Sequence, residues 1–124
     1  MTFGFIGTGN MGGALAVAAA KTGTELLLNN RTPAKAEALA RQLNCETATA
    51  QQIAASCDYI LLGVKPQMMG GLLSDLAPTL AQRTTPFTLV SMAAGLTMET
   101  IQKMAGLELY SGLGFRVIVF IIVY

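Results

Sequence analysis

The glycine-rich segment Gly7-Thr8-Gly9-Asn10-Met11-Gly12 has the residue types and spacing that best predict chemistry in this sequence. It follows a short β-forming run at residues 2–6 and precedes an Ala-rich helical run at residues 14–20. In such a segment the first glycine makes the turn out of a strand, the second lets a pyrophosphate approach the backbone, and the third lets the helix pack closely. The helix N-terminus adds unpaired N–H groups and a positive dipole. The segment therefore predicts a dinucleotide-binding loop, and the alternative is an ordinary glycine-rich turn between a strand and a helix.

The residues about 20 positions beyond these glycines should select the dinucleotide, because NAD-binding proteins place a carboxylate there. Here the segment is Asn29-Asn30-Arg31-Thr32, which contains no acid, and Glu25 lies at the other end of the expected strand. The guanidinium of Arg31 can bind the 2′-phosphate of NADP through charge-assisted hydrogen bonds, with Asn30 and Thr32 as neutral donors beside it. We therefore predict NADP (NADPH) in preference to NAD. The alternative is that Arg31 is a solvated turn residue and Thr32 only a helix cap.

Two further segments end expected strands, where the ligands of open α/β sheets bind. The first is Gly63-Val64-Lys65-Pro66, in which Pro66 fixes the turn and Lys65 can place a cation near a ribose or a phosphate. The second is Ser91-Met92-Ala93-Ala94-Gly95, whose small side chains would let a flat nicotinamide ring approach the backbone. Both also have plainer interpretations, namely a solvated lysine before a helix-starting proline and close packing of small residues.

Strands and helices are expected to alternate along the chain and to position these segments. We expect strands at residues 2–6, 25–29, 45–47, 58–64 and 87–91, and helices at residues 10–22, 33–43, 67–76 and 97–105, with a short helix opening at residues 49–52. Thr32 should cap the second helix, with Pro33 as its first residue, and Pro78 should stop the helix at 67–76. The alternation predicts an α/β, doubly wound domain with a mainly parallel sheet, which is a Rossmann-like dinucleotide-binding domain.

The composition excludes several classes of protein. The 124 residues suit a single domain, and with 52% apolar and 12% charged residues the chain is not a disordered segment. A net charge of +1 argues against nucleic acid as a partner. The chain has no histidine, which excludes histidine-based acid–base chemistry, and with only two cysteines a structural zinc site lacks ligands. We therefore expect no metal, and a small molecule as the substrate.

The sulfur-containing residues are expected to be structural. Cys45 and Cys57 are twelve positions apart and form no CxxC pair, so we expect reduced, buried thiols. A cytoplasmic location fits such thiols and the lack of a signal-peptide pattern. Four methionines are expected to fill the core: Met68, Met69, Met98 and Met104.

Taken together, the four segments resemble the N-terminal domain of pyrroline-5-carboxylate reductase. The resemblance rests on Gly7–Gly12, Asn30-Arg31-Thr32, Val64-Lys65-Pro66-Gln67 and Ser91–Gly95, and it covers residues 2 to about 105. The first segment is shared with 6-phosphogluconate-dehydrogenase-like and β-hydroxyacid-dehydrogenase-like domains, so the last two make the match specific. The resemblance implies NADPH-dependent reduction of the imine 1-pyrroline-5-carboxylate to L-proline, in which the cofactor carries the hydride and the protein supplies orientation and electrostatics. It assigns no catalytic residue.

The sequence departs from this family in two places. Thr49-Ala50 stands where family members usually carry an Asn near the adenine ribose. After about residue 106 the family continues into a Met-Pro-Asn-Thr-Pro-like loop and a helical domain that forms the dimer and completes the substrate pocket, which residues 107–124 do not match. We expect a dinucleotide-binding domain at residues 1–106 and an apolar, strand-like tail at 107–124, packed on the same domain or on a partner chain. Truncation or an altered reading frame near residue 106 would explain the departure.

The tail ends in an uninterrupted apolar run from Val117 to Tyr124. Eight residues are far fewer than the roughly 20 that a membrane-spanning helix needs, so we expect no membrane span but a buried or edge strand. An uncovered strand of this kind favours a homo-oligomer. Three interpretations remain open: the cofactor domain of a pyrroline-5-carboxylate reductase, another Rossmann reductase or dehydrogenase acting on a different imine or hydroxyacid, and a non-catalytic module that binds NADP.

Overall fold

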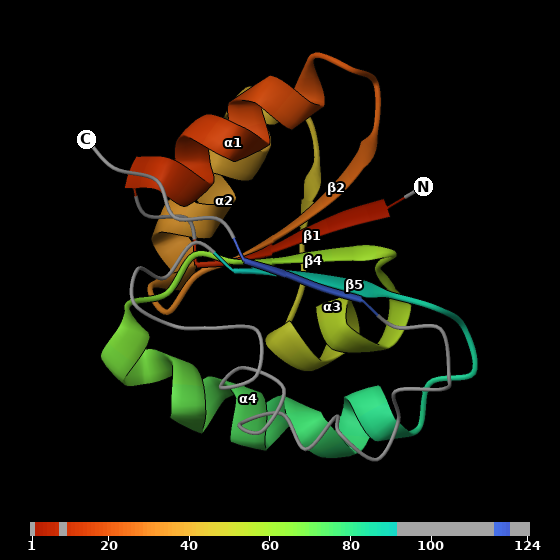
Figure 1. Ribbon diagram of the computed structural model, residues 1–124. Helices are drawn as coiled ribbons and strands as arrows, with labels where there is room; N and C mark the ends of the chain where they lie inside the picture. Colours follow the sequence, from red (N-terminus) through yellow and green to blue (C-terminus); the bar gives the residue numbers. More distant parts are fainter. Residues whose placement is uncertain (1, 8–9, 92–115, 120–124) are drawn as a thin grey trace.

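A computed structural model describes residues 2–7, 10–91 and 116–119 (Figure 1). The elements are β1 (Thr2–Ile6), α1 (Asn10–Ala20), β2 (Glu25–Asn29), α2 (Pro33–Leu43), β3 (Glu46–Thr47), α3 (Ala50–Ser56), β4 (Tyr59–Leu62), α4 (Pro66–Ala81), β5 (Thr88–Ser91) and β6 (Arg116–Val119). The helix predicted at residues 97–105 lies outside the described residues. No helix in the described part of the chain is both long and apolar enough to cross a membrane.

The strands form one six-stranded sheet in the order β3-β2-β1-β4-β5-β6, and every neighbouring pair is parallel. Helices α1 and α2 cover one face of the sheet, and α3 and α4 cover the other (Figure 1). Strand order reverses direction between β1 and β4, as in doubly wound dinucleotide-binding folds. The predicted fold class is therefore confirmed.

Side chains of successive strand residues point to opposite faces and build two cores. On β1, Phe5 packs under α1 and α2, whereas Ile6 packs against α3 and α4. Leu61 in β4 joins the first core, and its neighbour Leu62 joins the second. Burial on both faces explains why the central strands read as continuous apolar runs rather than as alternating ones.

Gly4 in β1 lets α3 approach the sheet closely. A Cβ atom at this position would collide with Cγ2 of Ile53 and lie 2.8 Å from Sγ of Cys57. Both of these side chains are fully buried, so they have little room to move. The glycine therefore sets the distance between α3 and β1.

Helix α4 contradicts the prediction that Pro78 stops it, because it continues to Ala81. Proline removes one N–H donor and disfavours the preceding turn. Here the helical path keeps Leu80 97% buried in the core beside Leu76, and the N–H of Gln82 donates to the carbonyl of Pro78 at 3.2 Å. Burial of Leu80 offsets the cost of the proline. The other predicted boundaries that fall on described residues agree with the observed ones or differ by one or two residues.

Arg83 joins the end of α4 to the end of α3. Its Nη1 donates to the carbonyl oxygens of Cys57 and Ala54 at 2.6 and 3.0 Å. Its Nη2 donates to Oγ1 of Thr85 and to the carbonyl of Pro86 at 3.1 and 3.2 Å. The guanidinium also lies over the ring of Phe87, 4.9 Å from the ring centre. Burial lowers the pKa of Arg83, and the nearby Asp58 opposes that shift.

Residues 116–119 form β6, which pairs with β5 at one edge of the described sheet. β6 overlaps the start of the apolar run Val117–Tyr124, for which the sequence predicts a buried or edge strand. The division into a domain at 1–106 and a tail at 107–124 stays a prediction, as does the packing of the tail on a partner.

Candidate dinucleotide site

The carboxyl ends of β1, β2 and β4 are held together by backbone hydrogen bonds. The N–H of Gly7 donates to the carbonyl of Asn29 at 2.9 Å, and the N–H of Gly63 donates to the carbonyl of Ile6 at 2.8 Å. The side chain of Asn29 donates to the carbonyl of Ala48 at 3.1 Å, which adds the segment after β3. Three of the predicted binding segments therefore begin at one edge of the sheet, at its switch point.

Gly7 has the backbone that a dinucleotide loop requires. Its φ of +89° lies in the region that side chains rarely adopt. A Cβ atom there would lie 2.8 Å from the carbonyl oxygen of Gly63. The turn thus needs glycine both for its conformation and for close approach. Helix α1 begins at Asn10, so its first N–H groups follow this turn directly.

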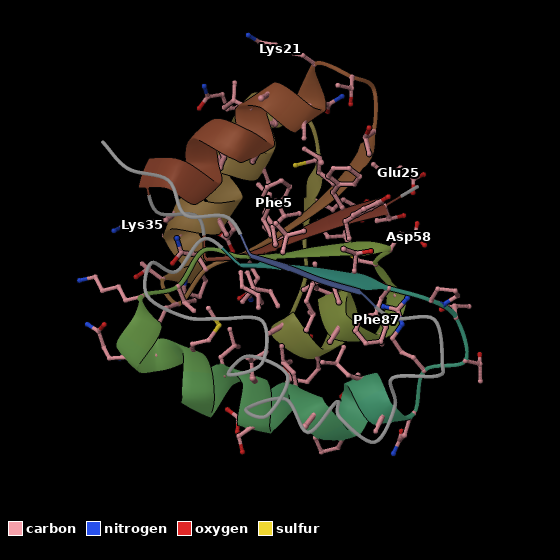
Figure 2. The ribbon with its side chains drawn as sticks, viewed as in Figure 1. Phe5, Lys21, Glu25, Lys35, Asp58 and Phe87 are labelled. Carbon is pink, nitrogen blue, oxygen red and sulfur yellow. The ribbon has the colours of Figure 1, made fainter. Side chains whose placement is uncertain are left out.

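A cavity of about 1370 Å³ opens at the same edge, and its walls come from β1, α1, the loop after β2, α2, the loop after β4, and α4. Among the described residues, its lining includes three cationic ones, Arg31, Lys35 and Lys65, against one carboxylate, that of Asp75. This balance favours an anionic ligand. Lys35 lies in the first turn of α2, close along the chain to Arg31, and it reaches out at this end of the molecule (Figure 2).

Lys35 was missed by the sequence reasoning, which considered only the residues up to the helix start. The sequence did contain a signal for Lys35. A lysine at the third position of the helix that follows Arg31 must lie near the loop after β2, which we call the corner after β2.

The corner after β2 differs in one respect from the prediction. Thr32 occupies the N-cap position of α2 and Pro33 begins the helix, but the Thr32 side chain makes no capping hydrogen bond. Instead, Oδ1 of Asn30 accepts from the N–H of Thr32 at 3.2 Å. The N–H of Lys35, which a capping hydroxyl could accept from, donates instead to the carbonyl oxygen of Thr32 at 3.0 Å. Arg31 is exposed and borders the cavity.

Met68 was predicted to fill the core, and that prediction is wrong. It lies in the first turns of α4, 40% of its surface is exposed, and it lines the cavity. Its Sδ lies 3.9 Å from Nη1 of Arg31. Its neighbour Met69 faces the sheet and is fully buried, as predicted. Consecutive residues of a helix point about 100° apart, which explains why only one of the two reaches the core.

Comparison with known proteins gives the family. Residues 2–95 match the family described as NADP oxidoreductase coenzyme F420-dependent. The chain belongs to this family. Since its members are NAD(P)-dependent oxidoreductases, the cavity at the switch point corresponds to the place where such folds bind a dinucleotide.

Several relatives of this family member are pyrroline-5-carboxylate reductases. Over 108 residues the chain is 32% identical to the enzyme from Escherichia coli (strain K12). This match covers 83% of the present chain and 39% of the Escherichia coli protein. A solved pyrroline-5-carboxylate reductase from Coxiella burnetii matches with a TM-score of 0.75 and 26% identity, over 84% of this chain and 39% of that one. The Plasmodium falciparum pyrroline carboxylate reductase, solved with NADP bound, matches with a TM-score of 0.63 and 26% identity, over 87% and 39% of the two chains.

The resemblance to the N-terminal domain of these reductases is thereby confirmed. The chain spans about two-fifths of the length of these relatives.

The remaining predicted site residues are placed only in part. Val64 is half-buried and lines the cavity, exposed Lys65 occupies the N-cap position of α4 and also lines it, and Pro66 is the first residue of that helix. Asn10, Met11 and Gly12 form the first residues of α1. Six other predicted site residues lie outside the described part of the chain: Thr8, Gly9, Met92, Ala93, Ala94 and Gly95.

The two cysteines of the chain are not among the residues that line the cavity. Both are free thiols; Cys57 is buried, whereas Cys45 is only half-buried, so the prediction of two buried thiols holds for one of them. Burial raises the pKa of Cys57, and burial together with Glu46 raises that of Cys45. Thiols with raised pKa values are poor nucleophiles near neutral pH, so neither is suited to covalent catalysis.

Proposed function

We propose that this chain is the cofactor-binding part of an NADPH-dependent reductase that acts on the C=N bond of 1-pyrroline-5-carboxylate and forms L-proline. The observation that carries the cofactor choice is the corner after β2, where Arg31 and Lys35 line the cavity and the strand end carries no carboxylate. The imine substrate is supported by the pyrroline-5-carboxylate reductases among the relatives. A cytoplasmic location and a homo-oligomer stay predictions.

The residues present fit a bound NADPH. The Gly7 turn and the start of α1 would hold the pyrophosphate against backbone N–H groups, because glycine at position 7 keeps a Cβ atom out of the turn. Arg31 and Lys35 would neutralise the 2′-phosphate, and Lys65 would face a ribose or phosphate from the loop after β4. Bound NADPH supplies the hydride, and the described residues of this chain hold and orient it.

The cofactor preference is tested by titrating NADPH and NADH calorimetrically into the parent protein and into two variants, Arg31→Ala and Lys35→Ala. Each variant should weaken NADPH binding by about 1.5–3 kcal/mol, the range for a hydrogen bond to a charged group, and should leave NADH binding nearly unchanged. Lys21→Ala is the matched control, since Lys21 is an exposed lysine just beyond the far end of α1 (Figure 2). Equal affinities of the parent for NADPH and NADH would overturn the assignment of the corner.

The reaction is tested in two steps. The chain alone should bind NADPH but oxidise it slowly with 1-pyrroline-5-carboxylate, because the relatives continue well beyond the matched part. Turnover at roughly 1–10³ per second would show that this chain needs no further domain. A chimera of residues 1–105 with the remaining part of the Escherichia coli reductase should turn over 1-pyrroline-5-carboxylate with NADPH. A chimera that binds NADPH but acts only on other imines or on hydroxyacids would favour another reductase or dehydrogenase. A chimera that binds NADPH and acts on none of these substrates would favour a non-catalytic module.

A further inference from the structure

Met68 places an accessible thioether in the wall of the cavity. Its side chain is 40% exposed, and its Sδ lies 3.9 Å from Nη1 of Arg31, which reaches the same space from the loop after β2. Its neighbour Met69 is fully buried in the core between α4 and the sheet. An oxidant dissolved in water can therefore reach the side chain of Met68, whereas close packing protects that of Met69.

Oxidation of Met68 changes what its contact with Arg31 can do. Hydrogen peroxide transfers one oxygen atom to a methionine sulfur, so that the thioether is oxidised to a sulfoxide and the peroxide is reduced to water. The thioether is only a weak hydrogen-bond acceptor, whereas the sulfoxide oxygen is a polar one. Since this oxygen projects from Sδ, a rotation of the exposed side chain brings it within the roughly 2.7–3.2 Å of a hydrogen bond to the Arg31 guanidinium.

We propose that Met68 is a site of reversible oxidation that regulates the cofactor preference of this cavity. The sulfoxide oxygen accepts from the Arg31 guanidinium and competes for its donors with the 2′-phosphate of NADPH. NADH has no 2′-phosphate, so the competition falls on NADPH. Methionine sulfoxide reductases restore the thioether, which makes the change reversible. The proposal rests on the role proposed above for Arg31 and adds a means of regulating it.

The site is tested by titrating NADPH and NADH calorimetrically into the parent before and after treatment with hydrogen peroxide. Mass spectrometry should find Met68 oxidised before Met69, as their burial predicts. Oxidation should lower the ratio of NADPH to NADH affinity about fivefold, because a competing acceptor weakens a hydrogen bond to a charged donor. Methionine sulfoxide reductases of both stereospecificities should restore the ratio. Met68→Leu has an apolar side chain without sulfur, so peroxide should leave its ratio unchanged.

Met68→Gln tests the contact without an oxidant, because it places an amide oxygen on a side chain of similar length. This variant, untreated, should show a lowered ratio of NADPH to NADH affinity, as the oxidised parent does. In an Arg31→Ala background, neither peroxide nor Met68→Gln should lower the ratio further. Lys35→Ala is the matched control background, since it removes a cation of the same cavity but keeps Arg31, and there both changes should still lower the ratio.

Three results would overturn this regulation: a Met68 that resists peroxide as Met69 does, a ratio that is unchanged after Met68 is oxidised, and an equal fall of the ratio in the parent and in Met68→Leu. Each of these would leave the NADPH preference of the untreated parent standing. An untreated parent that binds NADPH and NADH equally would instead overturn the role of Arg31, and the regulation with it.

Discussion

The Arg83 guanidinium offers a quantitative test of what holds α3 and α4 together on their face of the sheet. Replacement by alanine removes donors to four acceptors and a cation over the ring of Phe87. Hydrogen bonds from a charged donor contribute about 1.5–3 kcal/mol each, but the two on Nη2 are exposed to solvent and contribute less. The two part-buried bonds to Ala54 and Cys57 then dominate.

Taking the lower limit for each of these two bonds gives about 3 kcal/mol. The cation–π contact adds about 0.5–1 kcal/mol, and removing a partly buried charge recovers a similar amount of desolvation cost. We therefore expect Arg83→Ala to lower the free energy of unfolding by about 3 kcal/mol. Since domains are typically stable by about 5–15 kcal/mol, the variant should still fold. Arg83→Lys keeps the charge without the planar fork and should lose about half as much.

The assay is urea unfolding followed by circular dichroism, repeated at several protein concentrations so that association is detected separately. Arg41→Ala is the control, because Arg41 is an exposed arginine in the last turn of α2. It should change the free energy of unfolding by less than about 1 kcal/mol. A loss below about 1 kcal/mol for Arg83→Ala would contradict this prediction. It would mean that the hydrogen bonds from Arg83 to the carbonyls of Ala54 and Cys57 contribute no more than hydrogen bonds of the same groups to water.

Three further predictions follow from other parts of the structure. Gly4→Ala should destabilise the protein by about 1–3 kcal/mol, because its Cβ collides with Ile53, and a thermal midpoint equal to that of the parent would contradict this. Burial raises the pKa of Cys57 above that of the unfolded thiol, so the free energy of unfolding should fall as pH rises above about 9, where the unfolded thiol ionises first. Cys57→Ala should flatten this fall. Identical dependences of the unfolding free energy on pH in the parent and the variant would exclude a contribution of Cys57. Deleting residues 115–124 should lower the association state and leave NADPH binding nearly intact, because Val117–Tyr124 contains no charge or proline; light scattering that shows a monomeric parent would rule this out.

The fold could be predicted because each element carries its own local signal. The capping box of Thr49 and Gln52 is present in full, with Oγ1 of Thr49 accepting from the N–H of Gln52 and Oε1 of Gln52 accepting from the N–H of Thr49. β2 begins and ends at the predicted residues. Pro78 could not be predicted in the same way, because its effect depends on the burial of Leu80, which only the assembled core determines.

The site was predictable where glycine or backbone geometry decides it, and less so where side chains from different elements meet. Gly7 follows from a turn that one residue type alone satisfies. Lys35 and Met68 depend on how α2 and α4 are set against the sheet, and periodicity along a single helix does not give that orientation. Met68 and Met69 have the same residue type and adjacent positions, so the sequence alone cannot tell which of them faces the core.

The strand that comes first in the chain lies in the middle of the sheet, and this order constrains how the protein can be made. β1 pairs with both β2 and β4, and the Thr2 N–H donates to Oδ2 of Asp58, 56 residues further along, at 2.9 Å. During synthesis, the second edge of β1 can therefore be paired only after β4 has left the ribosome. A sheet built from hairpins can form strand by strand, whereas this parallel sheet must pair strands that are far apart in the sequence. Pairing of distant segments slows folding, and the apolar central strand β1 stays unpaired along one edge until β4 is available. The nascent chain should accordingly depend on chaperones until about residue 62 has emerged, a consequence of topology that no local change in β1 would remove.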